Sequence, residues 1–341
     1  MAKQLHVLVT GVGGDLGQAI VKALKLGVGD IVCHGCDIDS PSPGSAFVDS
    51  FHAVPRADDA SYIDVLNRLC LDMGIEAVIP GSEPETFVLS RAHDSLRKLP
   101  SGAVVVCQDA MWISVYGDKL ACMNALASHV DLVSFGDGAD ETVVNKLRSE
   151  NGFPLVVKER LASGGKNFGI AHDQADLDVL LKRSQKPLVQ RFIDGSGGEF
   201  SVGVFASEDF VQAIAFKREL GPGGCSWYAE TSDDSEVLDY ALRIAKLSRL
   251  RGSANVQVRK SSEGVRLLEV NPRFSSLSAA RAACGFNDVE WALELALGCL
   301  SIRRAQPVRQ IRFHRFFSEM VDFGSGLGRI TEWDPKSVTG R

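Results

Sequence analysis

Three oxygen-bearing side chains near residue 270 have the types and spacing of a magnesium site. Glu269 and Asn271 are two residues apart in the strand-like segment GVRLLEVNP, so both side chains project from the same face. A hairpin that turns near residues 262–264 would bring Gln257 beside them. Hard oxygen ligands without imidazole or thiolate are those that Mg²⁺ prefers, with substrate phosphates completing the octahedron. Arg273 continues the alternation and could hold a transferred phosphate, whereas a solvated sheet face would not explain these polar residues within an apolar run.

A second segment has the features of a phosphate-binding loop. Lys158 ends the apolar run VVK, and the glycine-rich turn Gly164-Gly165-Lys166 follows it. A lysine held by a strand can contact phosphate oxygens, while glycines let backbone N–H groups close over them. Taken alone, the segment is equally consistent with an ordinary hairpin that carries a surface lysine.

A third segment, LVQRFIDG at residues 188–195, alternates in polarity and is followed by Glu199. An extended segment of this kind can present backbone groups to the edge of an adenine ring. The later carboxylate can hold ribose hydroxyls. Alone, the segment would be interpreted as an amphipathic strand. The three segments together indicate a nucleotide site with a metal ion.

A glycine-rich loop, TGVGGDLG at residues 10–17, follows the first predicted strand and opens a helix. Backbone N–H groups at a helix start can hold phosphate. With Asp37 or Asp39 after the next strand, the spacing resembles that of extended short-chain dehydrogenases, so an NAD(P)-dependent reductase is an alternative hypothesis. Those enzymes use a Tyr-x-x-x-Lys pair, and none of the four tyrosines has a lysine four residues later. The glycines could instead allow close packing of helix on sheet or bind substrate, and the sequence leaves open whether residues Gly11 to Gly17 bind a ligand.

The elements that position these residues follow two patterns. Through about residue 110, short apolar runs alternate with helical spacing, which predicts an open, mostly parallel α/β domain. Its strands are expected at 6–10, 30–37, 76–80 and 103–107, and its helices at 15–26, 59–73 and 84–98. Helical sequence then surrounds residues 118 and 119, and the polar stretch FGDGAD at 135–140 is expected to join domains.

Beyond this stretch the strands are longer and come in adjacent pairs, which predicts antiparallel hairpins with flanking helices in an α+β arrangement. The strands are expected at 154–160, 188–192, 199–207, 210–220, 254–260, 264–272 and 311–321. The helices are expected at 174–183, 233–250, 275–284 and 288–297.

Composition excludes several classes of protein. The chain has 341 residues, 45% hydrophobic and 23% charged, enough for two or three domain-sized units. A net charge of -6 without a basic block argues against nucleic acid or a membrane surface as the partner. Neither a spanning apolar run nor a secretory signal is evident, so we expect a cytoplasmic protein. The eight cysteines are expected to be free thiols, because the lone CHGC motif has no second half of a zinc site.

Taken together, these residues resemble the ATP-grasp superfamily, most closely a single ATP-grasp half of carbamoyl-phosphate synthetases and related carboxylate-amine ligases. The resemblance runs from the front glycine turn through the GGK loop to EVNPRFSSLSAARAACGF. It implies a pre-ATP-grasp α/β domain at 1–110, followed by a two-lobed α+β ATP-grasp domain. The N-terminal lobe, with the phosphate loop, is expected at 111–187, and the C-terminal lobe, with the metal site, at 188–341. Because there is one such unit and not two, carbamoyl-phosphate synthesis by this chain alone is not expected.

The resemblance also implies roles for individual residues, with ATP between the two lobes and Mg²⁺, or alternatively Mn²⁺, on its phosphates. The phosphate-binding residues would be Lys119, Lys158, Gly164, Gly165 and Lys166. The adenine hinge would be Gln190, Arg191, Phe192 and Ile193, and the ribose ligand would be Glu199. The metal would be held by Gln257, Glu269 and Asn271, and the catalytic cations would be Arg273 and Lys166.

The implied reaction is ATP-dependent formation of an amide or peptide bond. A substrate carboxylate is phosphorylated and an amine attacks the acyl phosphate, which releases ADP and phosphate. Candidate substrate contacts are Lys217, Arg218, Arg281 and Glu83, although Arg281 could also be a helix-surface arginine. The expected partners are a small carboxylate and a small amine, with a homodimer left open. A non-catalytic ATP-binding module is the remaining alternative, and the complete metal-facing trio disfavours it.

Overall fold

Five parallel strands form the sheet of the front domain. The order of these strands is β3-β2-β1-β4-β5. The computed structural model describes residues 4–27, 29–40, 42–93, 97–161, 165, 167–300, 310–316, 318–322 and 327–329. The strands are β1 (Leu5–Val9), β2 (Ile31–Asp37), β3 (Ser50–Ala53), β4 (Ala77–Ile79) and β5 (Val104–Val105). The helices are α1 (Asp15–Lys25), η1 (Pro43–Phe47), α2 (Tyr62–Met73) and α3 (Glu83–Ala92). The predicted parallel α/β domain is confirmed, although the sequence analysis overlooked β3.

Both faces of this sheet are covered, which explains why its strands are continuously apolar. In β1, Val7 and Val9 pack into a core with α1, whereas Leu8 packs on the opposite face with residues of α2 and α3. The first of these cores also includes Trp291 and Phe286 from the C-terminal part of the chain. The front domain therefore shares a core with the last lobe, and this fixes their relative position.

Two short helices, α4 (Ala110–Tyr116) and α5 (Lys119–Leu126), connect the front domain to a four-stranded antiparallel sheet. The strand order of that sheet is β6-β9-β7-β8. It contains β6 (Phe135–Asp137), β7 (Leu155–Glu159), β8 (Gly169–Ala171) and β9 (Pro187–Arg191), with α6 (Glu141–Asn151) and α7 (Gln174–Arg183) packed on it. Strand β9 continues this sheet beyond residue 187, where the sequence analysis places the boundary between the lobes.

The interpretation of residues 135–140 as a linker was wrong. Residues Phe135–Asp137 form β6, and Asp140 caps α6 by accepting hydrogen bonds from the backbone N–H groups of Thr142 and Val143. A three-residue strand is too short to show an alternating pattern, and the aspartate that looked like linker sequence is a helix cap.

The third sheet has six antiparallel strands in the order β14-β13-β10-β11-β12-β15. These are β10 (Gly198–Ala206), β11 (Val211–Leu220), β12 (Ser226–Ser232), β13 (Gly252–Ser261), β14 (Gly264–Asn271) and β15 (Arg312–His314). The helices of this lobe are α8 (Ser235–Leu247), α9 (Ser278–Ala283) and α10 (Asp288–Leu297). The short η2 (Pro222–Gly224) precedes β12, a strand that the sequence analysis did not predict. The predicted strand at 311–321 is divided between β15 and β16 (Met320–Asp322), which pairs instead with β17 (Leu327–Arg329).

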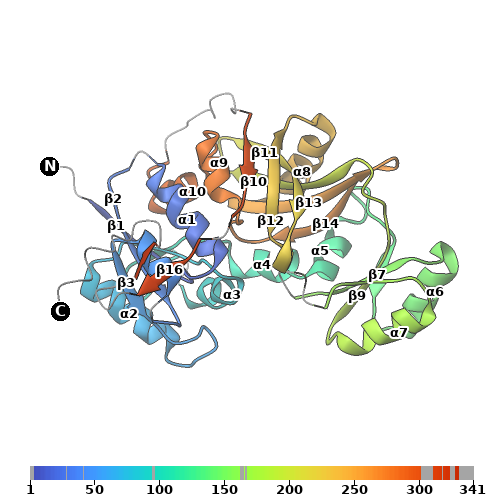
Figure 1. Ribbon diagram of the computed structural model, residues 1–341, viewed down its shortest axis with the longest axis horizontal. Coiled ribbons are helices and arrows are strands. Elements are labelled where there is room, and N and C mark those ends of the chain that lie inside the picture. The colour runs from blue at the N-terminus through green and yellow to red at the C-terminus, as the bar shows by residue number, and fades with distance from the viewer. Residues whose placement is uncertain are drawn as a thin grey trace.

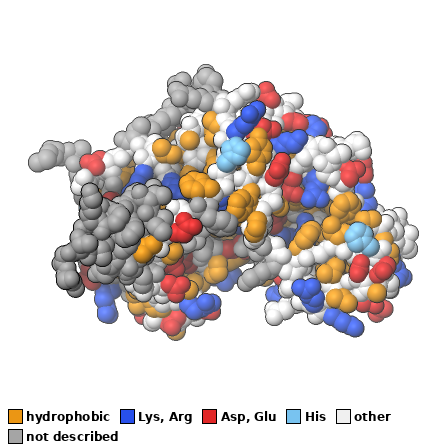
Figure 2. Space-filling view, in the orientation of Figure 1, with side chains coloured by type: hydrophobic (Ala, Val, Ile, Leu, Met, Phe, Trp, Pro, Cys, Tyr) orange, Lys and Arg blue, Asp and Glu red, His pale blue; other side chains and the backbone are white. Residues whose placement is uncertain are grey.

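The three sheets give the molecule its outline. Figure 1 shows the four-stranded lobe with α6 and α7 projecting to the right, the six-stranded sheet above the centre, and the front domain at the lower left. On the face drawn in Figure 2, acidic and basic side chains are interspersed among apolar ones. In the described ranges, no helix combines the length and apolar character needed to span a bilayer. The predicted α/β front domain followed by a two-lobed α+β unit is confirmed.

Candidate active site

A cavity of about 530 Å³ lies between the four-stranded and six-stranded sheets. This volume is within the range of cofactor and substrate sites. Its wall combines residues from β7, β9, β10, β13 and β14 with the start of α5, segments that are far apart in the sequence. The predicted residues in the wall are Lys119, Lys158, Gly165, Gln190, Arg191, Phe192, Ile193, Glu199, Arg218, Gln257, Glu269 and Arg273.

The metal-facing residues come from the β13–β14 hairpin. Gln257 is paired directly with Glu269, and Asn255 with Asn271, in a hairpin that turns near the predicted residues 262–264 and shifts register between Gln257 and Val258. The Nδ2 group of Asn271 donates a hydrogen bond to Oε1 of Glu269 over 2.9 Å. Asn271 is buried and outside the cavity wall, so it orients the carboxylate from behind. The predicted hairpin is confirmed, and the metal role of the three residues stays a prediction.

Glu269 carries a firmly ionised carboxylate. Its Oε2 atom lies 3.2 Å from Nζ of Lys119, the first residue of α5. Burial alone would raise the pKa of Glu269, but attraction to Lys119, the hydrogen bond from Asn271 and attraction to Lys158 together lower it to about 2. The carboxylate is therefore available as an anionic ligand over the whole physiological pH range.

Lys119 is held in place by a local network. Asp118 caps α5 by accepting from the N–H groups of Leu120 and Ala121, and it also accepts from Arg160 at 2.7 Å. The backbone N–H of Lys119 donates to the carbonyl of Arg160 over 3.3 Å. The helix start is thus tied to the end of β7, the strand that carries Lys158.

Lys158 is the second cation of the wall. Burial lowers its pKa to about 8, because desolvation and the nearby cations outweigh the attraction of Glu269 and Glu199. An ammonium group in such surroundings gains most from an anion that enters the cavity. Phosphate oxygens meet this requirement.

Glu199 is held by two arginines. Arg218 donates to its Oε1 over 2.8 Å, and Arg259 donates to its Oε2 over 2.7 Å. Burial opposes ionisation, but Arg218 and Arg259 lower the pKa of Glu199 below its usual value. Arg218 also donates to Oε1 of Gln257 over 2.6 Å. Arg218 therefore joins the expected ribose ligand to the expected metal ligand.

Sequence reasoning missed Arg259, which lines the cavity and pairs with Glu199. The signal was present, because Arg259 follows Gln257 by two residues and so projects from the same face of β13. Asn255 and Ser201 also line this wall and were missed. The glycine-rich turn before β12 also contributes to the wall.

The predicted hinge is packed into the four-stranded lobe. Gln190 is buried, and its amide nitrogen contacts the sulfur of Met123 at 3.0 Å. Arg191 forms two hydrogen bonds to Glu263 at the β13–β14 turn, at 2.8 and 2.6 Å. The side chain of Arg191 thus bridges the two lobes beside the cavity.

Part of the predicted phosphate loop, including Gly164 and Lys166, lies outside the described residues. Gly165 is described, lines the cavity and has a φ of 73°, a left-handed conformation that glycine adopts without strain. Its presence in the wall is consistent with the expected loop.

Arg273 faces the front domain. Its Nε atom lies 3.8 Å from Oε2 of Glu83, and its Nη1 group donates to the carbonyl of Phe274 over 3.0 Å. Glu83 begins α3, whose cap is Ser82. The structure therefore brings together two predicted residues that are 190 positions apart in the chain, and Arg273 is the one that lines the cavity.

Of the four tentative substrate residues, only Arg218 lines the cavity; Glu83 contacts Arg273 from outside the wall, and Lys217 and Arg281 also lie outside it. Lys217 is exposed and pairs across the sheet with Phe200, because neighbouring residues of a strand face opposite sides and Arg218 takes the cavity side. Arg281 is 0% exposed, forms an ion pair with Asp288 at 3.1 Å and donates to Oδ1 of Asn255. Arg281 is thus neither a substrate contact nor a helix-surface arginine, and it supports the cavity floor from behind.

The front glycine loop contributes Asp15 and Leu16 to the cavity wall. The loop is held by Asp37, whose Oδ2 accepts a hydrogen bond from the backbone N–H of Gly13 over 2.5 Å. Asp37 is the candidate ribose ligand of the dehydrogenase hypothesis, and in the structure its carboxylate stabilises the loop by this hydrogen bond. Glu85 and Tyr62 form a second buried hydrogen bond beneath the loop, at 3.0 Å.

The donor set fits Mg²⁺ only if a ligand adds further oxygens. Within the part of the chain that the structure describes, no group of three or more His, Cys, Asp or Glu side chains is arranged to hold a metal. Glu269 and the amide oxygen of Gln257 are hard oxygen donors. Mg²⁺ is usually bound by one or two carboxylates together with substrate phosphates, so these residues fit a metal that arrives with a nucleotide.

Comparison with known proteins gives matches to both parts of the chain. Residues 7–101 match the PylC-like N-terminal domain, and residues 183–316 match the ATP-grasp family in the biosynthetic pathway with Ter operon. The chain is 28% identical over 139 residues to a carbamoyl phosphate synthase arginine-specific large chain of Geobacillus stearothermophilus, covering 37% of this chain and 13% of that protein. It is 24% identical over 241 residues to a formate-dependent phosphoribosylglycinamide formyltransferase of a Synechococcus strain, covering 66% and 58%. The chain thus spans less than two thirds of these relatives.

Solved structures share the fold along nearly the whole chain. The ADP complex of an N5-carboxyaminoimidazole ribonucleotide synthetase superposes with a TM-score of 0.71 at 16% identity, covering 91% of this chain and 80% of that one. A biotin carboxylase domain of Hydrogenobacter thermophilus in complex with MgADP gives 0.71 at 16% identity, covering 89% and 72%. An L-amino acid ligase of Bacillus licheniformis gives 0.69 at 14% identity, covering 94% and 83%. Together with the sequence matches and the arrangement of the three sheets, these comparisons show that the chain has the fold of an α/β front domain followed by an ATP-grasp domain.

Proposed function

We propose that the protein is an ATP-dependent carboxylate-amine ligase that joins a small acid to a small amine through an acyl phosphate. The observation that carries the proposal is the convergence of Lys119, Lys158 and Glu269 in one interlobe cavity. Two cations suited to phosphate stand beside one ionised carboxylate suited to a metal. The formate-dependent formyltransferase among the relatives and the L-amino acid ligase among the structures support carbon-nitrogen bond formation.

In this proposal the triphosphate of ATP lies against Lys119 and Lys158, and the ribose lies near Glu199. Glu269 and Gln257 would hold Mg²⁺, or Mn²⁺, with Asn271 orienting the carboxylate. The bound ion would neutralise charge on the phosphates. Arg273, at the front-domain end of the cavity, stabilises the phosphoryl group during its transfer.

The reaction has two steps. A carboxylate oxygen of the acid attacks the γ-phosphorus, the bond from that phosphorus to the bridging oxygen breaks, and ADP leaves. The amine nitrogen then attacks the acyl carbon, the bond from that carbon to the phosphate oxygen breaks, and phosphate leaves while the nitrogen loses a proton to solvent. The acid would enter beside Arg273 and Glu83, where the wall meets the front domain. No covalent intermediate with the protein is needed.

A substrate screen tests the proposal. Purified protein is incubated with ATP, Mg²⁺ and pools of small acids and amines, and phosphate release is measured. We expect release that requires both an acid and an amine and that the Glu269→Gln variant lacks. ATP binding without acid-dependent turnover in any pool would favour a non-catalytic module. Dinucleotide binding without ATP binding would instead revive the reductase hypothesis.

A further inference from the structure

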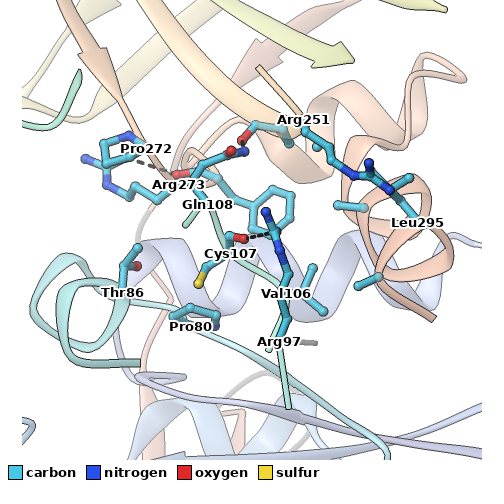
Figure 3. A pocket seen from close by; sticks show the side chains of 15 residues that line it. Pro80, Thr86, Arg97, Val106, Cys107, Gln108, Arg251, Pro272, Arg273 and Leu295 are labelled. Atoms are coloured by element: carbon cyan, nitrogen blue, oxygen red, sulfur yellow. Dashed lines mark hydrogen bonds between the residues drawn. The ribbon is translucent and has the colours of Figure 1, made fainter. Parts of the chain in front are cut away.

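A second cavity, of about 370 Å³, lies where the front domain meets the six-stranded lobe (Figure 3). Its wall combines the ends of β4 and β5 with the start of β13, the segment after β14 and one side of α10. The amide of Gln108 donates to the carbonyl of Ser253 over 3.0 Å and so ties the two domains together at this cavity. The cavity is therefore bounded by the interface between the front domain and the six-stranded lobe.

All charged side chains in the described wall of this cavity are arginines: Arg97, Arg251 and Arg273. Arg97 donates to the carbonyl of Cys107 over 2.6 Å, as the dashed line in Figure 3 shows, so this bond directs its guanidinium without neutralising it. Its φ of 60° is unusual for a residue other than glycine, and such strain gathers at functional sites. The ion partner of Arg251 is Glu208, an 80% exposed residue outside the wall.

The rest of the wall is largely apolar. Val106 and Leu295 lie around the same space as the guanidinium groups (Figure 3), and Phe274 also lines the cavity. Guanidinium groups recognise carboxylates and phosphates through paired hydrogen bonds. A ligand that is complementary to the whole wall therefore carries an anionic group and a small apolar portion.

The second cavity is separate from the nucleotide site. Among the described lining residues, Arg273 is the single one that the two cavities share. An occupant of the second cavity can thus be present while ATP is bound, and it would lie behind the arginine that we assign to the phosphoryl group.

We propose that this second cavity binds a small organic anion, a carboxylate or a phosphate monoester, at the same time as ATP. The site is additional to the proposed ligase reaction and does not depend on it. Arg97 and Arg251 hold the anionic group, and the apolar residues contact the remainder of the ligand.

Calorimetric titration tests the site with two probes, succinate and glycerol 3-phosphate. The protein is kept saturated with Mg²⁺ and a non-hydrolysable ATP analogue, so that the nucleotide cavity is filled throughout. We expect at least one probe to bind with a dissociation constant at or below about 10 mM. The uncharged counterparts, succinamide and glycerol, should give no binding.

Two variants assign the binding to this cavity. Arg251→Gln and Arg97→Gln should each weaken binding of the probe about tenfold or more, since each removes a charge-assisted contact. Arg183→Gln, at an exposed position on α7, is the matched control and should bind as the wild type does. Affinity for the ATP analogue and the thermal unfolding curve report whether a variant is folded. The proposal is overturned if neither probe binds, or if both folded arginine variants bind the probe as well as the wild type.

Discussion

The ammonium group of Lys119 lies 3.2 Å from the carboxylate of Glu269, at the meeting point of the cavity walls. We assign the first residue to phosphate and the second to a metal ion, and in the ligand-free protein they neutralise each other. Mutual neutralisation lowers the cost of burying two charges in the same wall. A metal-nucleotide complex carries a cation and anionic phosphates. The metal ion can therefore bind Glu269 and a phosphate can bind Lys119, so that each residue exchanges one ionic contact for another.

Replacing Glu269 by Gln should reduce ATP turnover by about 10²-fold or more, because the principal anionic ligand for the metal is lost. The volume of the side chain is retained, so the variant should fold. Phosphate release at saturating Mg²⁺ measures the effect. Glu150→Gln, on the exposed face of α6, is the control and should retain turnover. Near-wild-type turnover of Glu269→Gln would place the metal elsewhere.

ATP binding should weaken as the pH rises through about 8. Burial lowers the pKa of Lys158 to about 8, so its ammonium form, the form that binds phosphate, is lost above that value. Bound phosphate favours the ammonium, and binding above this pH should therefore take up a proton. Calorimetry on either side of pH 8, in buffers of different ionisation enthalpy, measures both effects. The Lys158→Arg variant keeps its positive charge at these pH values, so its affinity for ATP should depend less steeply on pH. A dependence as steep as that of the wild type would exclude Lys158 as the titrating group.

Removing the carboxylate of Glu199 should destabilise the protein as well as weaken ATP binding. Glu199→Ala leaves Arg218 and Arg259 without their shared anion. Breaking a fully buried ion pair costs about 3–5 kcal/mol, and these partly buried pairs should cost less than that but more than the roughly 1 kcal/mol of an exposed pair. Urea denaturation measures the loss. Glu150→Gln removes an exposed ion pair and should change the free energy of unfolding much less. Equal effects of the two substitutions would show that the Glu199 cluster contributes no special stability.

The β13–β14 site could be predicted from the sequence because its geometry is local. Alternation along the strands and a turn near residue 263 predict that Gln257 lies close to Glu269. In the structure the two residues are directly opposite each other, and a register shift between Gln257 and Val258 sets this pairing. The same rule would have identified Arg259, which was overlooked. By contrast, the pairing of Lys119 with Glu269 joins residues 150 positions apart, and no local pattern contains it.

Arg281 and Lys217 show the limit of such reasoning for charged residues. The sequence around Arg281 is that of an ordinary helix, and its complete burial depends on Asp288 and Asn255, which tertiary packing brings to it. Lys217 and Arg218 are neighbours, so only one of them can face the cavity, and the sequence does not say which. Strand β12 was missed because a glycine-rich turn leads into it without a clear alternation.

The most direct test of the proposed reaction follows oxygen from the substrate acid. Once the screen has identified an acid and an amine, the acid is labelled with ¹⁸O in its carboxylate and turned over with ATP, and the products are analysed by mass spectrometry. Attack of the carboxylate on the γ-phosphorus predicts one labelled oxygen in each molecule of phosphate released. Label in AMP would mean that the acid is adenylated, and retention of all label in the product would mean that the carboxylate was never activated by phosphorylation. Either of these results would contradict the acyl-phosphate mechanism.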